Sequence, residues 1–225
     1  MVKIGVYSLC LGIMVSYLGG SVLHAQDNTL KQCLSEQVKA MQAVANNKLP
    51  KQGAFFQPFD PTYQKYQQIH RDWAECVKGH QMPLSSFKTL TGEFYDSSSL
   101  AGKVLVINFW FMSCAPCVAE MPALNKLVEN YKGKDVLFLG FSTDKAEQLK
   151  PAFFQQHPFD FNIIADSRDI AKSFYFLGSP TTYIVDQRGV IQNAWVGGIG
   201  LGQRALEPYD RAKAAIDKLL LTAHK

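Results

Sequence analysis

Two cysteines separated by two residues form the most reactive pattern in this 225-residue sequence. Cys114 and Cys117 enclose Ala115-Pro116 and follow an apolar run that ends at Trp110. If that run is a strand and a helix begins at the motif, Cys114 stands at a helix N-terminus, where free N–H groups and the helix dipole stabilise a thiolate. Thiolates attack disulfides, and Cys117 can then attack the resulting mixed disulfide. The pattern predicts a redox-active dithiol that needs no further cofactor.

A C-x-x-C pair also begins many zinc sites. A zinc site would need a second such pair or two suitably spaced histidines downstream, and the sequence contains neither. The position of the motif between a predicted strand and a predicted helix therefore favours redox chemistry, and we expect no metal there.

The first 25 residues have the pattern of an export signal. Lys3 is followed by an uncharged run at residues 4–23, which contains Cys10, and small residues precede Ala25. This pattern is typical of a secretory signal peptide, and the run is also long enough to span a bilayer. We interpret residues 1–25 as a signal peptide or a membrane anchor. The rest of the chain is then expected in the periplasm or at the outer face of the cytoplasmic membrane.

The remaining two cysteines, Cys33 and Cys76, lie in a segment with helical periodicity at residues 26–81. Apolar residues recur there at intervals of three or four, namely Leu30, Leu34, Val38, Met41 and Ala45, then Tyr63, Tyr66, Ile69, Trp73 and Val77. An antiparallel pair of helices would bring the two cysteines together, and an oxidising compartment favours a disulfide between them. A metal site at Cys76 with His80 and His70 is the alternative, although it lacks a visible fourth ligand.

Residues 82–225 alternate between predicted strands and predicted helices. This alternation is typical of an α/β fold with helices on both faces of one sheet. The apolar runs at 104–110 and 136–141 are typical of buried central strands. We expect the other elements as a hairpin at 86–95, helices at 117–131, from about 144, at 170–176 and at 204–221, and strands at 161–164, 181–185 and 190–196.

Composition and glycine spacing argue against two classes of function. Hydrophobic residues make up 47% of the chain and charged residues 19%, which is typical of a globular protein. The net charge is +4 without any run of Lys or Arg, so we expect no nucleic-acid partner. The glycines at 197–202 have G-x-G-x-G spacing with no βαβ unit after them, and we interpret this segment as a connection rather than a phosphate site.

The segment from Met82 to Trp195 resembles the exported thioredoxin-like reductases of the TlpA/ResA type. The resemblance rests on Leu84-Ser85-Ser86-Phe87, Gly102-Lys103, Asn108-Phe109-Trp110, the C-A-P-C motif, Glu120-Met121-Pro122 and the segment from Gly178 to Asp186. It implies a thioredoxin-like fold, in which helices flank a central mixed sheet and a cis-proline faces the cysteines. Residues 26–81 lie outside the resemblance and would form an N-terminal helical extension.

The resemblance also implies roles for residues beside the cysteines. Pro180 aligns with the cis-proline of the family and, with Ser179, would present its backbone to a substrate strand. Trp110 falls in the substrate-binding group by the same comparison. Glu120 aligns with a carboxylate that assists proton transfer at the cysteines. The alternative for Glu120 is a solvent-facing acid of the kind that the first turns of a helix favour.

Two positions depart from the pattern of the relatives. Thioredoxin has a buried Asp where this chain has Asn108, and because Asn does not accept a proton, proton handling would pass to Glu120 or to water. Most relatives have Trp immediately before the first cysteine, where this chain has Ser113. The nucleophile would therefore lack an aromatic neighbour at that side.

We predict a thiol–disulfide oxidoreductase that reduces disulfides of exported proteins. Ala115-Pro116 carries no charge that would stabilise a thiolate, which favours a reductant over an oxidant. Clients of related proteins include apocytochromes c and copper-site proteins, and the electrons would come from a membrane protein or a thioredoxin-like donor.

Two alternative functions are compatible with the same fold. One is a copper-binding assembly factor with Met112 and Met121 as soft ligands, although such proteins separate their cysteines by three residues. The other is a thiol peroxidase, which is disfavoured because the Thr and Pro that usually precede its reactive cysteine are missing from the sequence.

Overall fold

The computed structural model describes residues 19–46, 61–84, 86–197 and 207–222. Cys10, most of the predicted export segment and the glycines at 198–202 lie outside these ranges. Within them, no helix is both long enough and apolar enough to cross a membrane. The elements run in the order α1 (Gly19–Asn46), α2 (Pro61–Val77), β1 (Ser86–Lys88), β2 (Phe94–Asp96), α3 (Ser97–Leu100), β3 (Val104–Trp110), α4 (Ala115–Asn130), β4 (Val136–Ser142), α5 (Pro151–Gln156), β5 (Asn162–Ile164), α6 (Arg168–Ser173), β6 (Thr181–Val185), β7 (Ile191–Val196) and α7 (Glu207–Thr222).

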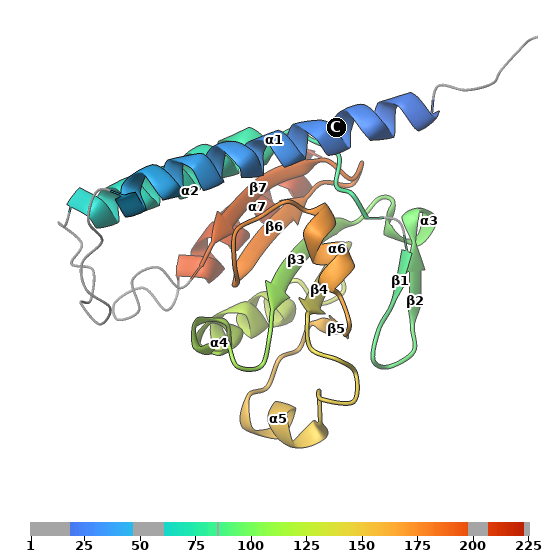
Figure 1. Cartoon of the computed structure of the whole chain (residues 1–225). Helices are drawn as coiled ribbons and strands as arrows, with labels where there is room; N and C mark the ends of the chain where they lie inside the picture. The colour runs from blue at the N-terminus through green and yellow to red at the C-terminus, as the bar shows by residue number, and fades with distance from the viewer. Residues whose placement is uncertain (1–18, 47–60, 85, 198–206, 223–225) are drawn as a thin grey trace, which may run out of the picture.

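A mixed five-stranded sheet with the order β5-β4-β3-β6-β7 forms the centre of the molecule (Figure 1). Strands β3, β4 and β5 are parallel, and β6 and β7 are antiparallel to their neighbours. Val104 pairs with Val136 and Trp110 with Ser142, so β3 and β4 end at the same edge of the sheet. The loops that follow both strands therefore meet at one edge, and the cysteine motif comes directly after one of these loops.

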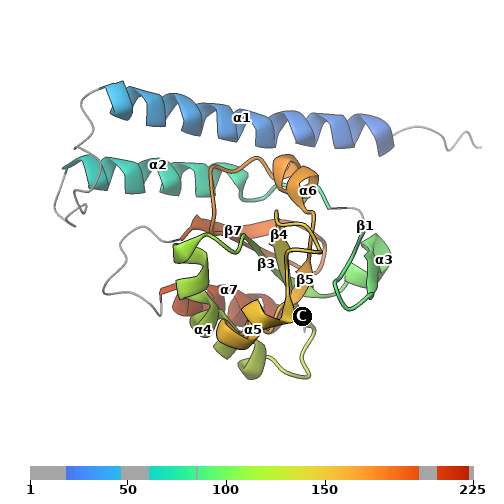
Figure 2. The same ribbon diagram turned by 60° about the horizontal axis from the view of Figure 1, so that its bottom comes forward.

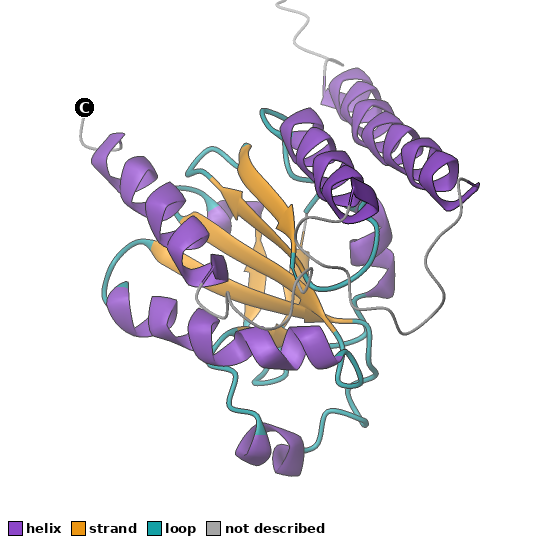
Figure 3. Cartoon of the chain, turned by 90° about the vertical axis from the view of Figure 1, so that its left-hand side faces the viewer, coloured by secondary structure: helices purple, strands orange, loops and turns teal. Residues whose placement is uncertain are grey.

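Strand β3 shows why the sheet is covered on both faces. All seven of its residues are buried, and successive side chains of a strand point to opposite faces. One set packs with α1, α2 and α6, and the other packs with α4 and α7 (Figure 3). The first set is Leu105, Ile107 and Phe109, and the second is Val104, Val106 and Trp110. This confirms the predicted thioredoxin-like α/β arrangement of a mixed sheet flanked by helices.

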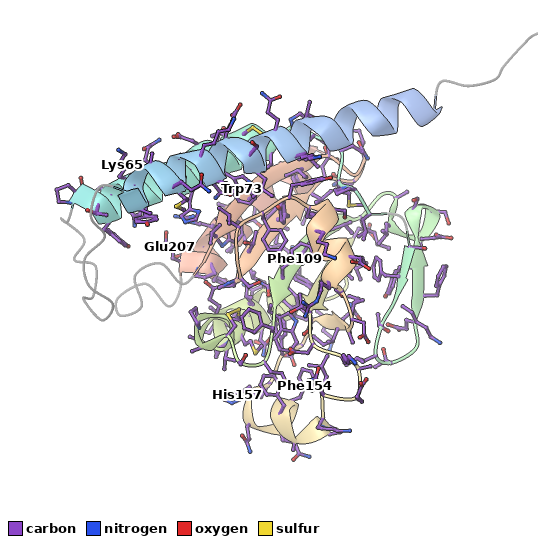
Figure 4. The ribbon with its side chains drawn as sticks, in the orientation of Figure 1. Lys65, Trp73, Phe109, Phe154, His157 and Glu207 are labelled. Atoms are coloured by element: carbon purple, nitrogen blue, oxygen red, sulfur yellow. A yellow bond between two sulfur atoms is a disulfide. The ribbon has the colours of Figure 1, made fainter. Side chains whose placement is uncertain are left out.

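Helices α1 and α2 run side by side along one face of the sheet (Figures 1 and 2). The Trp73 side chain of α2 is 2% exposed, and its indole N–H donates to the Tyr175 carbonyl at 3.2 Å. Its ring meets Tyr183 of β6 edge-on at 5.8 Å, which places it between the helices and the sheet (Figure 4). The helical segment that precedes residue 82 therefore shares one hydrophobic core with the sheet, rather than standing apart from it.

The prediction of a helix from about residue 144 is wrong. Residues 143–150 form bends and turns, and α5 begins only at Pro151. Aspartate often caps a helix that follows it. The Asp144 carboxylate instead accepts hydrogen bonds from Ser142 Oγ at 2.8 Å and from the Met112 N–H at 2.7 Å. It is therefore tied to the loop after β3 and not to a helix of its own. The predicted hairpin, central strands and helix after the cysteines are confirmed.

Candidate active site

Cys114 and Cys117 stand at the N-terminus of α4, directly after the loop that follows β3. Cys114 is the N-cap residue, and Pro116 occupies the first turn, where a missing N–H costs no helical hydrogen bond. The two sulfurs form a disulfide with Cα atoms 5.2 Å apart. The backbone N–H of Cys117 points at Cys114 Sγ with N and S 3.3 Å apart. A donor in this position at a helix N-terminus stabilises negative charge on Cys114 once the disulfide opens.

Both cysteines lie close beneath the surface. Cys114 is 5% exposed and Cys117 is 3% exposed, while Ser113 and Ala115 beside them are exposed. Ser113 places no aromatic ring beside the motif. Disulfide exchange requires access to the attacking sulfur. The exposed residues on both sides of Cys114 place this part of the chain at the protein surface, where a client can approach.

The loop before β6 faces the cysteines. The Ser179–Pro180 peptide bond is cis, in agreement with the resemblance. The Ser179 carbonyl oxygen lies 3.7 Å from Cys114 Sγ. Pro180 itself is buried and Ser179 is half-buried. The fold thus brings together two predicted site residues that are far from the cysteines in sequence.

Glu120 is buried one turn after Cys117 on α4. It is 7% exposed, so the alternative of a solvent-facing acid is wrong. Its carboxylate lies against the α-carbon of Gly197, just after β7, where a methyl group would stand 2.7 Å from the Glu120 carboxyl carbon. A buried carboxylate close to a dithiol is a group that can exchange protons with it.

Trp110 does not line a client surface, and this prediction is wrong. Its side chain is 0% exposed, because it points into the layer beneath α4 and is covered by the aromatic residues of α5 and the loop after it. The ring of Phe153 stacks on that of Trp110 with centroids 5.8 Å apart. The rings of Phe154 (Figure 4) and Phe159 meet it edge-on. Trp110 is a core residue that supports the loop carrying the cysteines.

Asp144 is a site residue that the sequence analysis missed. Its carboxylate accepts the Met112 N–H, in the turn that precedes Cys114. The same turn is closed by a hydrogen bond from the Cys114 N–H to the Phe111 carbonyl at 3.1 Å, and the Trp110 carbonyl accepts from the Thr143 N–H at 3.3 Å. Because Asp144 contacts a residue 32 positions away, no local pattern in the sequence signals this role.

Asn108 occupies the middle of β3 and is buried. Its amide nitrogen donates to Thr182 Oγ1 on β6 at 3.0 Å. This side chain therefore links two strands and provides no carboxylate beneath the cysteines. Glu120 is the acid on the cysteine-bearing helix that the fold buries next to the motif.

The metal alternative at Cys76 is wrong, because that sulfur is bonded to Cys33 across α1 and α2 with Cα atoms 5.7 Å apart. His70 instead contacts the Gln37 amide at 3.0 Å, and burial lowers the pKa of its imidazole from 6.5 to about 4. In the part of the chain that the structure describes, no group of three or more His, Cys, Asp or Glu side chains is arranged to hold a metal ion.

Comparisons with known proteins agree with this geometry. The chain is 37% identical over 134 residues to the thioredoxin-like protein YneN of Bacillus subtilis, covering 59% of this chain and 79% of that protein. It is 29% identical over 133 residues to the thiol-disulfide oxidoreductase ResA of Bacillus cereus, covering 59% and 77%. The crystal structure of the thioredoxin domain of a thiol-disulfide oxidoreductase from Bacteroides vulgatus matches with a TM-score of 0.51 and 25% identity, over 61% of this chain and 96% of that one.

A protein-family model identifies the family of this chain. The AhpC/TSA family model matches residues 78–194, which include both cysteines of the motif, Glu120 and the cis-proline. Together with the C-A-P-C disulfide at the start of α4 and the named relatives, this match establishes the chemistry as thiol–disulfide exchange. The chain therefore belongs to the AhpC/TSA family, and it is a thioredoxin-like thiol–disulfide oxidoreductase.

Proposed function

We propose that the protein is a TlpA/ResA-type reductase that acts outside the cytoplasm on disulfides of exported proteins. The observation that carries this proposal is the Cys114–Cys117 disulfide at the N-terminus of α4, with the Ser179 carbonyl 3.7 Å from Cys114 Sγ. The uncharged run at residues 4–23 supports export. Disulfide-bearing clients such as apocytochromes c or copper-site proteins, and a membrane or thioredoxin-like electron donor, belong to the same proposal.

The reaction begins with the thiolate of Cys114. It attacks one sulfur of the client disulfide, so that the client S–S bond breaks and one client thiolate leaves and takes up a proton. Cys117 then loses its proton to Glu120 or to water and attacks Cys114 Sγ. The second client sulfur leaves, and the enzyme ends with the Cys114–Cys117 disulfide. A donor dithiol must return two electrons, and one proton must be taken up at Cys117, to restore the Cys114 thiolate and the Cys117 thiol.

Cys114 is assigned as the attacking residue because its sulfur is the N-cap atom of α4. It receives the Cys117 N–H with N and S 3.3 Å apart, and the Cys114 residue is 5% exposed against 3% for Cys117. Cys117 lies one turn deeper and resolves the mixed disulfide. Pro180 and Ser179 lie opposite Cys114, where a peptide strand of the client would pair with their backbone.

The direction of electron flow follows from what surrounds the sulfurs. Ala115 and Pro116 provide no positive charge that would favour the reduced dithiolate. An ionised Glu120 on the same helix would disfavour a second negative charge near it. Both features stabilise the disulfide relative to the thiolate, which is the property of a reductant.

Trapping tests the proposal. In Cys117→Ala the mixed disulfide formed by Cys114 cannot be resolved, so exported proteins should be recovered from cells as covalent partners that reducing agents release. The double variant Cys114→Ala/Cys117→Ala is the control and should recover none. A Cys114–Cys117 potential near −270 mV would support a reductant, whereas one near −120 mV, or an empty trap, would overturn the proposal.

A further inference from the structure

Gly197 follows β7 directly and stands between the cis-proline loop and α4. Its N–H donates to the Pro180 carbonyl at 2.8 Å. This bond extends the β6–β7 ladder by one position beyond the pairing of Thr181 with Val196. The glycine spacing at 197–202 predicts a connecting segment, but Gly197 pairs with the backbone of the site.

With Glu120 in its observed position, the space at Gly197 has no room for a side chain. A methyl group on its α-carbon would overlap Oε1 of Glu120, and it would stand 2.7 Å from the carboxyl carbon and 2.9 Å from Oε2. Ordinary contacts between such atoms begin near 3.5 Å. Because Gly197 is held by its bond to Pro180, the carboxylate of Glu120 would have to move.

Backbone conformation does not explain this glycine. Gly102 and Gly133 have positive φ values of 80° and 77°, and a methyl group on either would meet nothing within 4 Å. Their backbone conformation requires glycine. Gly197 is not among the positive-φ glycines, so the close approach of the Glu120 carboxylate is the reason for glycine at this position.

We propose that Gly197 is a positioning residue for the exchange reaction. By lacking a side chain, it lets the Glu120 carboxylate lie buried one turn from Cys117 and beside the end of β7 that is bonded to Pro180. This inference rests on the proposed role of Glu120 as the group that takes the proton from Cys117. A general base acts only from within hydrogen-bond reach of the proton or through one water, so the position that Gly197 permits sets the rate of the resolving step.

The test separates attack by Cys114 from resolution by Cys117. Reduced protein is mixed with 5,5′-dithiobis(2-nitrobenzoate), whose first thiolate is released by Cys114 and whose second is released by Cys117. Both phases are followed by stopped-flow absorbance between pH 5 and pH 9. The variants are Gly197→Ala, Glu120→Ala, the double variant Glu120→Ala/Gly197→Ala and, as a matched glycine control, Gly133→Ala.

Gly197→Ala is expected to slow the second phase about tenfold or more near neutral pH, because general-base catalysis contributes at least that factor. Its pH profile should match that of Glu120→Ala, and the double variant should be no slower than Glu120→Ala alone. Gly133→Ala should lower the urea midpoint, because its backbone conformation disfavours alanine, and should leave both phases as in the wild type.

The inference is overturned if Gly197→Ala lowers the urea midpoint but keeps the wild-type second phase, or if its effect multiplies with that of Glu120→Ala. It is also overturned if Glu120→Ala leaves the second phase unchanged. The reductase proposal would survive those results, because client trapping by Cys117→Ala does not depend on Glu120. If Gly197→Ala does not fold, the double variant Glu120→Asp/Gly197→Ala should fold, because the shorter aspartate relieves the overlap with the alanine methyl group. It should show the slow second phase, because its carboxylate does not reach the position of the Glu120 carboxylate.

Discussion

The two disulfides of this chain have opposite relations to the fold. Cys33–Cys76 joins α1 to α2 across 43 residues, and Cys33 packs in the core on one face of the sheet. Cys114–Cys117 spans three residues at the start of α4 and packs in the core on the other face. One disulfide therefore joins distant parts of the chain, whereas the other lies within a single turn.

Chain entropy explains why these two bonds suit different tasks. In the loop-closure model a cross-link over about 43 residues stabilises the folded state by about 4 kcal/mol, and one over a few residues by about half of that. Opening the short disulfide therefore costs the fold little. The short disulfide also lies beside the cis-proline loop, and Glu120 is buried one turn further along the same helix. The contacts given above for the long disulfide include neither feature. The bond that opens in every reaction cycle is therefore the one on which the stability of the fold depends less.

The largest effect that separates the two disulfides concerns activity. Cys114→Ala removes the attacking sulfur, and we expect insulin disulfide reduction to fall by about 1,000-fold or more, as for loss of other enzyme nucleophiles. The matched variant Cys33→Ala/Cys76→Ala should keep the exchange rate of the folded protein. Equal loss of activity in both variants would contradict the separation of roles between the two disulfides.

The second effect concerns stability and has the opposite order. Cys33→Ala/Cys76→Ala should lower the free energy of unfolding by about 4 kcal/mol, measured by urea titration without reductant. Cys114→Ala/Cys117→Ala should lower it by about half as much or less. If removal of the short disulfide destabilises the protein more, the assignment of the long disulfide as the structural one is wrong.

Asp144 offers a finer test on the side of the redox motif. Asp144→Ala removes the acceptor of the Met112 N–H, and the loosened turn should slow disulfide exchange by about tenfold while costing about 1–2 kcal/mol of stability. Asp144→Asn keeps an oxygen acceptor and should lie closer to the wild type in both measurements.

The matched control for Asp144 is Asp186→Ala. Asp186 accepts the backbone N–H groups of Arg188 and Val190 at the end of β6 that lies away from Pro180. Its loss should cost similar stability and leave the exchange rate unchanged. An exchange rate lowered equally in both variants would mean that Asp144 acts through stability alone.

His70 provides the corresponding test on the side of the helices. Burial lowers the pKa of His70 from 6.5 to about 4, so the unfolded chain binds a proton between these pH values that the folded chain does not. The free energy of unfolding is therefore unaffected by His70 above pH 6.5. It decreases as the pH falls from 6.5 towards 4, and the decrease is complete below pH 4. The expected change is about 1–2 kcal/mol, smaller than the full shift because water reaches part of the ring.

Urea titrations at several pH values measure this effect against His70→Gln, which cannot take up the proton. The variant should lack the decrease between pH 6.5 and pH 4. If it shows the same decrease as the wild type, other groups cause it. The exchange rate of folded molecules should not differ between the two proteins at pH 7, because His70 lies between α1 and α2 and not near α4.

Local patterns in the sequence predicted most of the fold. The apolar runs of β3 and β4 and the spacing around Tyr63 and Trp73 correspond to the buried strands and helix of the structure. Periodicity carries this information because it reports which side of an element is buried. The redox motif was predictable for the same reason, since two cysteines and the helix N-terminus that activates them are neighbours in the chain.

The errors in the sequence analysis share one cause. Trp110 was assigned to a client surface and Asp144 to the start of a helix, and Gly197 was assigned to a connection. The role of each residue depends on a partner far away in the chain. Trp110 packs against the aromatic residues around α5, Asp144 accepts the Met112 N–H, and Gly197 lies against the Glu120 carboxylate. A single sequence without such contacts does not distinguish a buried tryptophan from one that binds a client.

The sequence by itself determined the chemistry of this protein, because a dithiol, its spacing and the helix N-terminus beside it are encoded within four residues. It also determined the class of fold, because buried strands and amphipathic helices leave periodic patterns. Only the tertiary structure decided what surrounds the dithiol: Ser179 beside Cys114, Asp144 beneath the turn, and Gly197 against Glu120. These contacts depend on how separate elements pack, and packing is a property of the folded chain rather than of any segment of it.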